Sequence, residues 1–295
     1  MVLKSKFLGF FLLILSSTSG CNSQELPVEL DVELAQMKLD RGFILFDATA
    51  YTSKPNLAVY GFKPMQNIQA FWDAGESQEN LPSEARVKAL SRKVLKDKEV
   101  AFVDIEHWPL QGTEKQVKVS LLKYKTVLDW VKEASPQVKL GLYSMFPIRD
   151  YWRAVKSESH HEYKQWQREN DQLKALAESD SVDIIYPSIY TYYRDQEGWV
   201  KYAIANIKEA RRLNPNKPVY VFLWPQYHGS SKLFRHTYIA GDYWKLQLET
   251  VYKYADGVII WGGWDFDKWK AEAWNDSAPW WKSTQEFVKD IASKE

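Results

Sequence analysis

The sequence predicts an α/β fold, a distorted TIM-like (β/α) barrel in which about seven parallel strands form a ring inside a layer of helices. Short runs of β-branched and aromatic residues alternate with longer amphipathic segments, which is the pattern of successive βαβ units. The chain has 295 residues, and 45% of them are hydrophobic. Because a single barrel needs about 250 residues and a large core, one domain is expected from residue 28 to residue 295.

Strands and helices are expected in alternation along most of this domain. The strand segments are short and rich in Val, Ile, Leu and aromatic residues, and the helical segments have an apolar face and cap-like first residues such as Ser83 and Ser283. The predicted strands cover residues 43–48, 68–72, 100–105, 139–144, 182–187, 218–224 and 257–261. The predicted helices cover residues 83–97, 114–134, 150–178, 196–213, 241–255 and 283–294.

The first 27 residues have the pattern of an export signal and a short tether. Lys4 and Lys6 precede an apolar run at residues 7–15 that is too short to span a bilayer, which predicts a signal peptide over residues 1–20. Cys21 follows small residues and resembles the lipidated cysteine of bacterial lipoproteins, although Thr18 stands where that motif usually has Leu. We therefore expect an exported protein attached to a membrane through Cys21. The alternative is an ordinary secretory signal.

Charge and composition narrow the classes of partner. The 39 basic and 38 acidic residues are interleaved and leave a net charge of +1, so no basic face for nucleic acid is expected. Cys21 is the only cysteine, which excludes an internal disulfide. Aromatic residues make up 15% of the chain, which suits either a groove for sugar rings or a large barrel core.

Active sites of such barrels lie at the C-terminal ends of the strands, so polar residues there are the candidates. We expect Asp47, Tyr190 and Tyr227 to contact substrate, although Asp47 could equally belong to the scaffold. His228, Asp265 and Asp267 stand at similar positions. Asp183 begins its strand at the opposite end, and we expect it to be structural.

The strongest chemical signal is a pair of carboxylates, Asp104 and Glu106. Strand side chains alternate between faces, so these two point the same way, with backbones about 6.5 Å apart. Two carboxylates at that distance repel each other, which raises the pKa of one of them. A protonated carboxylic acid beside an ionised carboxylate is the arrangement that cleaves a glycosidic bond. The alternative is a pair of structural carboxylates. The five histidines, including the adjacent His160 and His161, show no metal-ligand spacing, so no metal site is expected.

Four segments resemble the animal and venom hyaluronidase family. They are VDIEHWP at 103–109, GLYSMFP at 141–147, DIIYPSIY at 183–190 and GVIIWG at 257–262. They follow the order of that family and reach from about residue 100 to residue 262. The resemblance implies a barrel of seven strands and a substrate-assisted retaining mechanism, in which the acetamido oxygen of an N-acetylhexosamine attacks the sugar.

By the same resemblance, Glu106 would be the general acid and then the base, and Asp104 would orient the acetamido group. Tyr190 and Trp261 would hold that group, and Tyr151 corresponds to a further family tyrosine. The chain departs from the family in having no disulfides and no C-terminal cysteine-rich module. It also lacks the family's Arg after the motif's Trp, because Trp108 is followed directly by Pro109.

The sequence thus predicts an endo-acting glycoside hydrolase that cleaves N-acetylhexosaminide bonds in a glycosaminoglycan such as hyaluronan or chondroitin, with no cofactor. An acidic polysaccharide is favoured by cations in the loops after the strands, which could pair with uronate carboxylates. The alternatives are a hydrolase of another glycan on the same barrel and a non-catalytic surface glycan-binding lipoprotein. The cations are Arg149, Arg194, Lys232 and Arg235.

Overall fold

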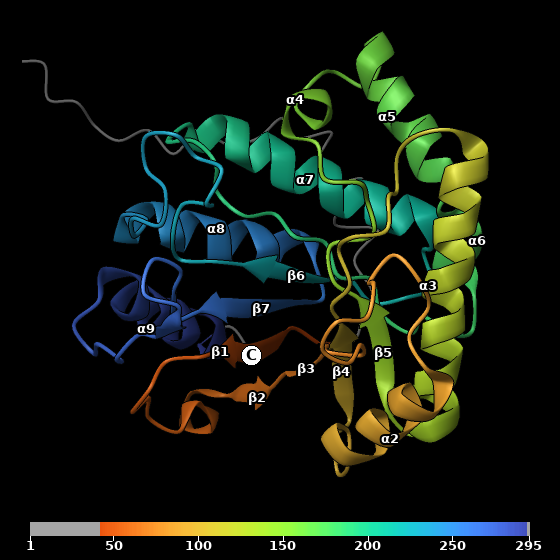
Figure 1. Ribbon diagram of the computed structural model, residues 1–295. Coiled ribbons are helices and arrows are strands. Elements are labelled where there is room, and N and C mark those ends of the chain that lie inside the picture. The colour runs from red at the N-terminus through yellow and green to blue at the C-terminus, as the bar shows by residue number, and fades with distance from the viewer. Residues whose placement is uncertain (1–41, 294–295) are drawn as a thin grey trace, which may run out of the picture.

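The computed structural model describes residues 42–293, shown in Figure 1. The expected signal peptide, the tether and Cys21 lie outside the described residues. Within residues 42–293, no helix combines the length and the apolar character that crossing a membrane would require.

The strands form a ring of parallel neighbours. One sheet has the order β2 (Phe62–Pro64), β1 (Ile44–Thr49), β7 (Gly257–Gly262) and β6 (Tyr220–Leu223), and a second has the order β3 (Gln66–Ile68), β4 (Val100–Val103) and β5 (Lys139–Leu142). β2 and β3 are consecutive parts of one extended segment. It pairs first with β1 and then with β4, so it joins the two sheets into one wall.

The extended segment 183–189 closes the ring between β5 and β6. The amide of Ser144 donates to the carbonyl of Tyr186 at 3.0 Å, and the amide of Phe222 donates to the carbonyl of Pro187 at 2.8 Å. Parallel bridges join Tyr143 to Tyr186 and Ser188 to Phe222. The pairing is interrupted because a proline has no N–H to donate to a ladder. This segment replaces the regular strand expected at residues 182–187, and the barrel of seven strand segments is confirmed.

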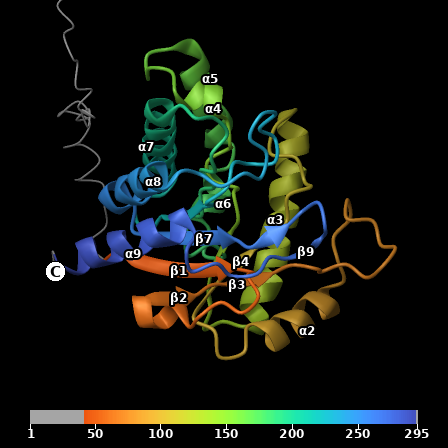
Figure 2. The ribbon, with the colours of Figure 1, turned by 90° about the vertical axis from the view of Figure 1, so that its left-hand side faces the viewer.

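Helices surround the ring, as Figures 1 and 2 show. The helices α3 (Glu114–Ala134) and α7 (Gln196–Leu213) have the predicted bounds. Their N-caps, Thr113 and Asp195, accept hydrogen bonds from the amides of Gln116 and Gly198, which fixes where each helix begins. The others along the wall are α2 (Glu84–Val94), α8 (Gly241–Tyr254) and α9 (Pro279–Ala292), and a short 3₁₀ helix, η1, covers Leu57–Tyr60.

The prediction of a single helix at residues 150–178 is wrong. The chain forms α4 (Tyr151–Ala154), α5 (His161–Asp171) and α6 (Lys174–Glu178) instead. Asp150 caps α4 by accepting from the amide of Arg153, and His160 caps α5 through Nδ1, which accepts from the amide of Glu162. Two caps inside one amphipathic pattern divide it into separate helices.

Other elements also differ from expectation, mostly at their ends. The prediction of a strand at residues 68–72 is wrong, because the strand in this part of the chain, β3, ends at Ile68. The last helix begins at Pro279, before the predicted start at residue 283, because proline is well suited to the first turn of a helix. An antiparallel hairpin of β8 (Trp264–Asp265) and β9 (Lys270–Ala271) follows β7 and was not predicted.

Alternation along the strands divides the core into two layers. Phe46, Phe102 and Phe222 belong to a buried cluster inside the ring, whereas Leu45 and Val103 belong to the cluster between the strands and the helices. Phe102 faces inward, so residues 104 and 106 also face the interior if the alternation continues. The amide of Asp104 donates to the carbonyl of Ile68 at 3.2 Å, so strand pairing extends past the end of β4.

Charged groups stabilise the end of the barrel opposite these residues. Asp183 accepts from Lys132 at 2.6 Å and from the amide of Leu140 at 2.8 Å, so the structural role predicted for it is confirmed. Asp256 and Arg211 form a fully buried ion pair at 3.1 Å, and Asp256 also accepts from the amide of Val219. Removing one partner of such a pair leaves an uncompensated buried charge.

We expect Asp256→Ala to lower the free energy of unfolding by about 3–5 kcal/mol, measured by urea denaturation, because Arg211 stays charged and buried. The control is Glu197→Gln, which removes an ion pair with Lys201 in which the side chains are 64% and 54% exposed. That change should lower it by less than about 1 kcal/mol. Equal effects of the two substitutions would contradict the prediction.

Candidate active site

A cavity of about 290 Å³ opens at the C-terminal ends of the strands. Its lining comes from β4, β6 and β7 and from the residues that follow β4, β5, the segment 183–189, β6 and β7, so the ring itself positions the site. The two carboxylates come from the segment after β4, whereas aromatic rings come from every other part of the lining. The lining residues are Phe102, Asp104, Glu106, Tyr143, Arg149, Tyr190, Phe222, Trp224, His228, Trp261 and Phe266.

Asp104 and Glu106 both line this cavity, as the alternation along β4 predicts. The side chain of Glu106 is 53% exposed, whereas Asp104 lies deeper. Burial, and then the charge of Glu106, raise the pKa of Asp104 to about 6, and a hydrogen bond with Asn67 opposes the shift. The site therefore holds two neighbouring carboxyl groups in different environments, which is the arrangement that acid–base chemistry needs.

Arg149 lies beside the carboxylates on the loop after β5. Its guanidinium is 3.8 Å from the carboxylate of Glu106 and interacts electrostatically with Tyr192 and Tyr143. Burial raises the pKa of Tyr143 to about 12, so its hydroxyl keeps its proton, and this hydroxyl lies 3.3 Å from the hydroxyl of Ser188. The cavity thus presents a permanent positive charge next to the more exposed of its two carboxylates.

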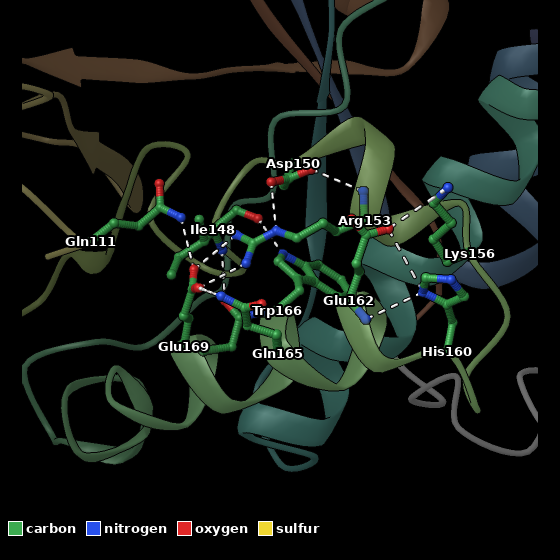
Figure 3. Close-up of polar contacts among 11 residues, drawn as sticks. Gln111, Ile148, Asp150, Arg153, Lys156, His160, Glu162, Gln165, Trp166 and Glu169 are labelled. Carbon is green, nitrogen blue, oxygen red and sulfur yellow. Dashed lines mark hydrogen bonds and ion pairs between the residues drawn. The ribbon is translucent and has the colours of Figure 1, made fainter.

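The loops that carry Glu106 and Arg149 are tied together by the polar network in Figure 3. Arg153 donates to both carboxylate oxygens of Glu169, at 2.7 and 2.8 Å, and to Asp150 at 2.7 Å. Gln111, in the loop after β4, donates to the same Glu169 at 2.8 Å. Glu169 on α5 therefore links the two loops and helps to set the distance between Glu106 and Arg149.

A second hollow, of about 220 Å³, adjoins the cavity. Both are lined by Glu106, Tyr143 and Arg149, and the second extends between the loops after β4 and β5 to Trp108 and Gln111. Glu106 consequently lies at the boundary between two spaces.

Aromatic rings form most of the remaining wall of the cavity. The rings of Tyr190 and Trp261 are stacked at 6.2 Å, and Trp224 meets Trp261 edge to face at 4.9 Å. His228 lies beside Tyr190, and burial, followed by the charge of Arg149, lowers its pKa to about 4. The imidazole is therefore neutral at neutral pH and adds no charge to this wall.

Four of the predicted contact residues lie outside the lining. Asp47 bonds Lys54 at 2.6 Å and both the amide and the hydroxyl of Thr49, which favours its scaffold interpretation. Arg194 lies 4.2 Å from the ring of Phe234. Tyr227 packs on the same Phe234, and Tyr151 packs against Tyr193 and Tyr202. The structure brings together Asp104, Glu106, Arg149, Tyr190 and Trp261.

Solved structures share this fold. Bee venom hyaluronidase aligns with a TM-score of 0.57 and 16% identity over 85% of this chain and 97% of that chain. The structure of bee venom hyaluronidase in complex with a hyaluronic acid tetramer aligns with a TM-score of 0.55 and 14% identity over 85% of this chain and 96% of that chain. An endo-β-1,4-mannanase from Thermotoga petrophila aligns with a TM-score of 0.53 and 12% identity over 90% of this chain and 73% of that chain. No protein-family model and no curated sequence matches the chain. At these identities the likeness shows the barrel fold, as predicted.

Besides the core rings of Phe102 and Phe222, sequence reasoning assigned no role to four residues of the lining, although signals for three of those four were present. Tyr143 is two residues beyond Gly141 in a quoted motif, and Trp224 is two residues beyond the inward-facing Phe222, so alternation could have found both. His228 stands directly after Tyr227, the neighbour that was selected. Phe266 belongs to the hairpin that was not predicted, and it carries no signal in the sequence.

The raised pKa of Asp104 is testable by ¹³C NMR of its carboxyl group, which should titrate near pH 6. Glu106→Gln should lower this pKa but leave it above 3.8, because burial, the larger cause, remains. The folded protein holds this proton more tightly than the unfolded chain does, so stability should fall as the pH rises from about 4 to about 6. Asp104→Asn must remove both the carboxyl resonance that titrates near pH 6 and the fall in stability between about pH 4 and about pH 6. An unchanged pKa in Glu106→Gln would show that the two carboxyl groups do not interact.

Proposed function

We propose that the protein is an endo-acting glycoside hydrolase that cleaves N-acetylhexosaminide bonds in a glycosaminoglycan such as hyaluronan or chondroitin. One observation carries the proposal: Glu106 lies where an aromatic cavity meets a second hollow, with Asp104 deeper in the same cavity. A sugar on each side of Glu106 would place the bond between them next to a carboxyl group. The shared fold with bee venom hyaluronidase and with a mannanase is consistent with action on glycans.

The chemistry follows from these positions. Glu106 donates a proton to the glycosidic oxygen, the acetamido oxygen of the sugar in the cavity forms a bond to C1, and the bond to the leaving sugar breaks. Water then attacks C1 and gives its proton to Glu106, which restores the acid and releases the acetamido group. Asp104 accepts from the acetamido N–H and stabilises the positive charge that develops there. With a pKa of about 6, it carries the negative charge that this role needs above that pH.

The aromatic wall would hold the sugar. Tyr190, Trp224 and Trp261 present ring faces and edges that suit the apolar faces of a pyranose, and Tyr143 offers a hydroxyl. No resident cofactor enters this scheme, because proton transfer and the substrate's own nucleophile suffice.

Arg149 supports an acidic substrate. It is the one member of the four predicted rim cations that lines the cavity as the structure describes it. A guanidinium can bind a uronate carboxylate through two parallel hydrogen bonds. Export of the protein and its attachment through Cys21 remain part of the proposal, supported by the pattern of residues 1–21 alone.

Glu106→Gln tests the reaction. We expect kcat on hyaluronan or chondroitin to fall by about 10²–10⁴-fold while binding of the polymer persists, because the amide cannot transfer a proton. Turnover is measured by reducing-end release. Glu178→Gln is the matched control, since Glu178 is 52% exposed, close to the 53% of Glu106, and lies on α6. Unchanged turnover in Glu106→Gln would remove Glu106 from the mechanism. Binding without turnover by the unaltered protein would indicate a glycan-binding protein instead.

Arg149→Gln tests the acidic substrate. We expect KM for hyaluronan to rise about tenfold, equivalent to about 1.4 kcal/mol, relative to KM for a neutral N-acetylglucosamine oligomer. The ratio of the two KM values is the readout, because it cancels any effect of Arg149 on Glu106 that both substrates share. Arg194→Gln, at a cation outside the cavity lining, should leave the ratio unchanged. An equal rise for both substrates would argue against recognition of a carboxylate.

A further inference from the structure

The hairpin β8–β9 presents an unusual residue, Trp269, next to the cavity. The ring is 74% exposed, and the backbone has a φ of 51°, in the left-handed region that residues other than glycine rarely adopt. An exposed ring and a left-handed backbone are both unfavourable in a free protein. Such a combination points to a function for the exposed ring.

Trp269 is connected to the cavity through one further ring. It meets Phe266 at 6.4 Å and Trp264 at 6.0 Å. Phe266 lines the cavity and lies 6.0 Å from Trp261 and 5.8 Å from Trp224. A chain of ring contacts therefore leads from the cavity to the surface of the hairpin.

The hairpin is held in place before any ligand arrives. Asp265 accepts from the amides of Asp267 and Lys268 at 3.0 and 2.9 Å, which fixes the turn. At its base, Gly263 has a φ of +80°, and a Cβ there would lie 2.6 Å from the amide nitrogen of Tyr51, so the backbone packs too closely for any side chain. Because the ring of Trp269 is already positioned, a ligand that stacks on it needs to order little of the protein.

The hairpin and the second hollow lie on opposite sides of the cavity. The hairpin follows β7, whereas the hollow lies between the loops after β4 and β5, and the order of strands places these on different sides of the ring. Figure 2 shows the hairpin beyond the end of β7. A glycan with its reacting bond at Glu106 would therefore extend in one direction into the hollow and in the other toward Trp269.

We propose that Trp269, with Trp264 and Phe266, forms a further binding site for a pyranose ring of the same glycan, on the non-reducing side of the sugar in the cavity. The site stacks the apolar face of that ring, and it requires a substrate with at least one sugar beyond the N-acetylhexosamine that reacts. This inference rests on the proposed function, which supplies the position of the reacting bond and the class of ligand.

The test measures binding of hyaluronan oligosaccharides of two, four, six and eight sugars by calorimetry. The parent is full-length Glu106→Gln, which prevents turnover. Adding Trp269→Ala should weaken binding of the oligosaccharides that carry a sugar beyond the reacting N-acetylhexosamine about three- to tenfold and leave binding of N-acetylglucosamine alone, measured in the same way, unchanged. Trp269→Phe should restore most of the loss. Trp152→Ala is the matched control. Trp152 is 62% exposed, and its ring partners, Tyr151 and Tyr193, do not line the cavity.

Each outcome decides between the proposals. Equal affinity of parent and Trp269→Ala for every length would overturn the stacking site and leave the proposed function intact. An equal loss in Trp152→Ala would overturn it too, because the effect would then belong to any exposed tryptophan. A parent that binds no hyaluronan oligosaccharide would overturn the proposed substrate class, and the stacking site for that glycan with it.

Discussion

The site depends on the alternation of side chains along β4 and the residues that follow it. Phe102 fills the interior of the ring, and Asp104 and Glu106 continue in the same direction as the interior opens into the cavity. A register shift of one residue would send both carboxylates toward the helices and bring Ile105 into the cavity instead. The packing of large rings inside the barrel therefore stabilises the fold and also fixes the direction of its acidic groups.

The surroundings then make the two carboxyl groups different from one another. Asp104 is close to the aromatic interior, and its burial outweighs the hydrogen bond with Asn67, which favours the charged form. Glu106 is more exposed and lies near Arg149. Depth in the cavity thus raises the proton affinity of Asp104, and the charge of Glu106 adds to that effect.

Much of this arrangement could be predicted from the sequence, and the exceptions have physical causes. Strand periodicity located β4 and its carboxylates, and the helices α3 and α7 have the expected bounds because strong caps mark their starts. Periodicity did not show that Asp150 and His160 divide one amphipathic pattern, since a cap depends on backbone geometry. Residues Tyr151 and Tyr227 stand after strands yet face other rings, because position in a loop does not fix side-chain direction. Arg149 could be identified as a rim cation, but its closeness to Glu106 arises from contacts between loops far apart in the sequence.

The network centred on Glu169 has a consequence for how this barrel can change. Glu169 belongs to α5, outside the lining of the cavity, yet it binds Arg153 beside the Arg149 loop and Gln111 beside the Glu106 loop. Residues on that helix therefore govern the spacing of a cation and an acid that they do not touch. Substitutions on an outer helix can therefore change the spacing of Arg149 and Glu106 while both of these residues stay the same.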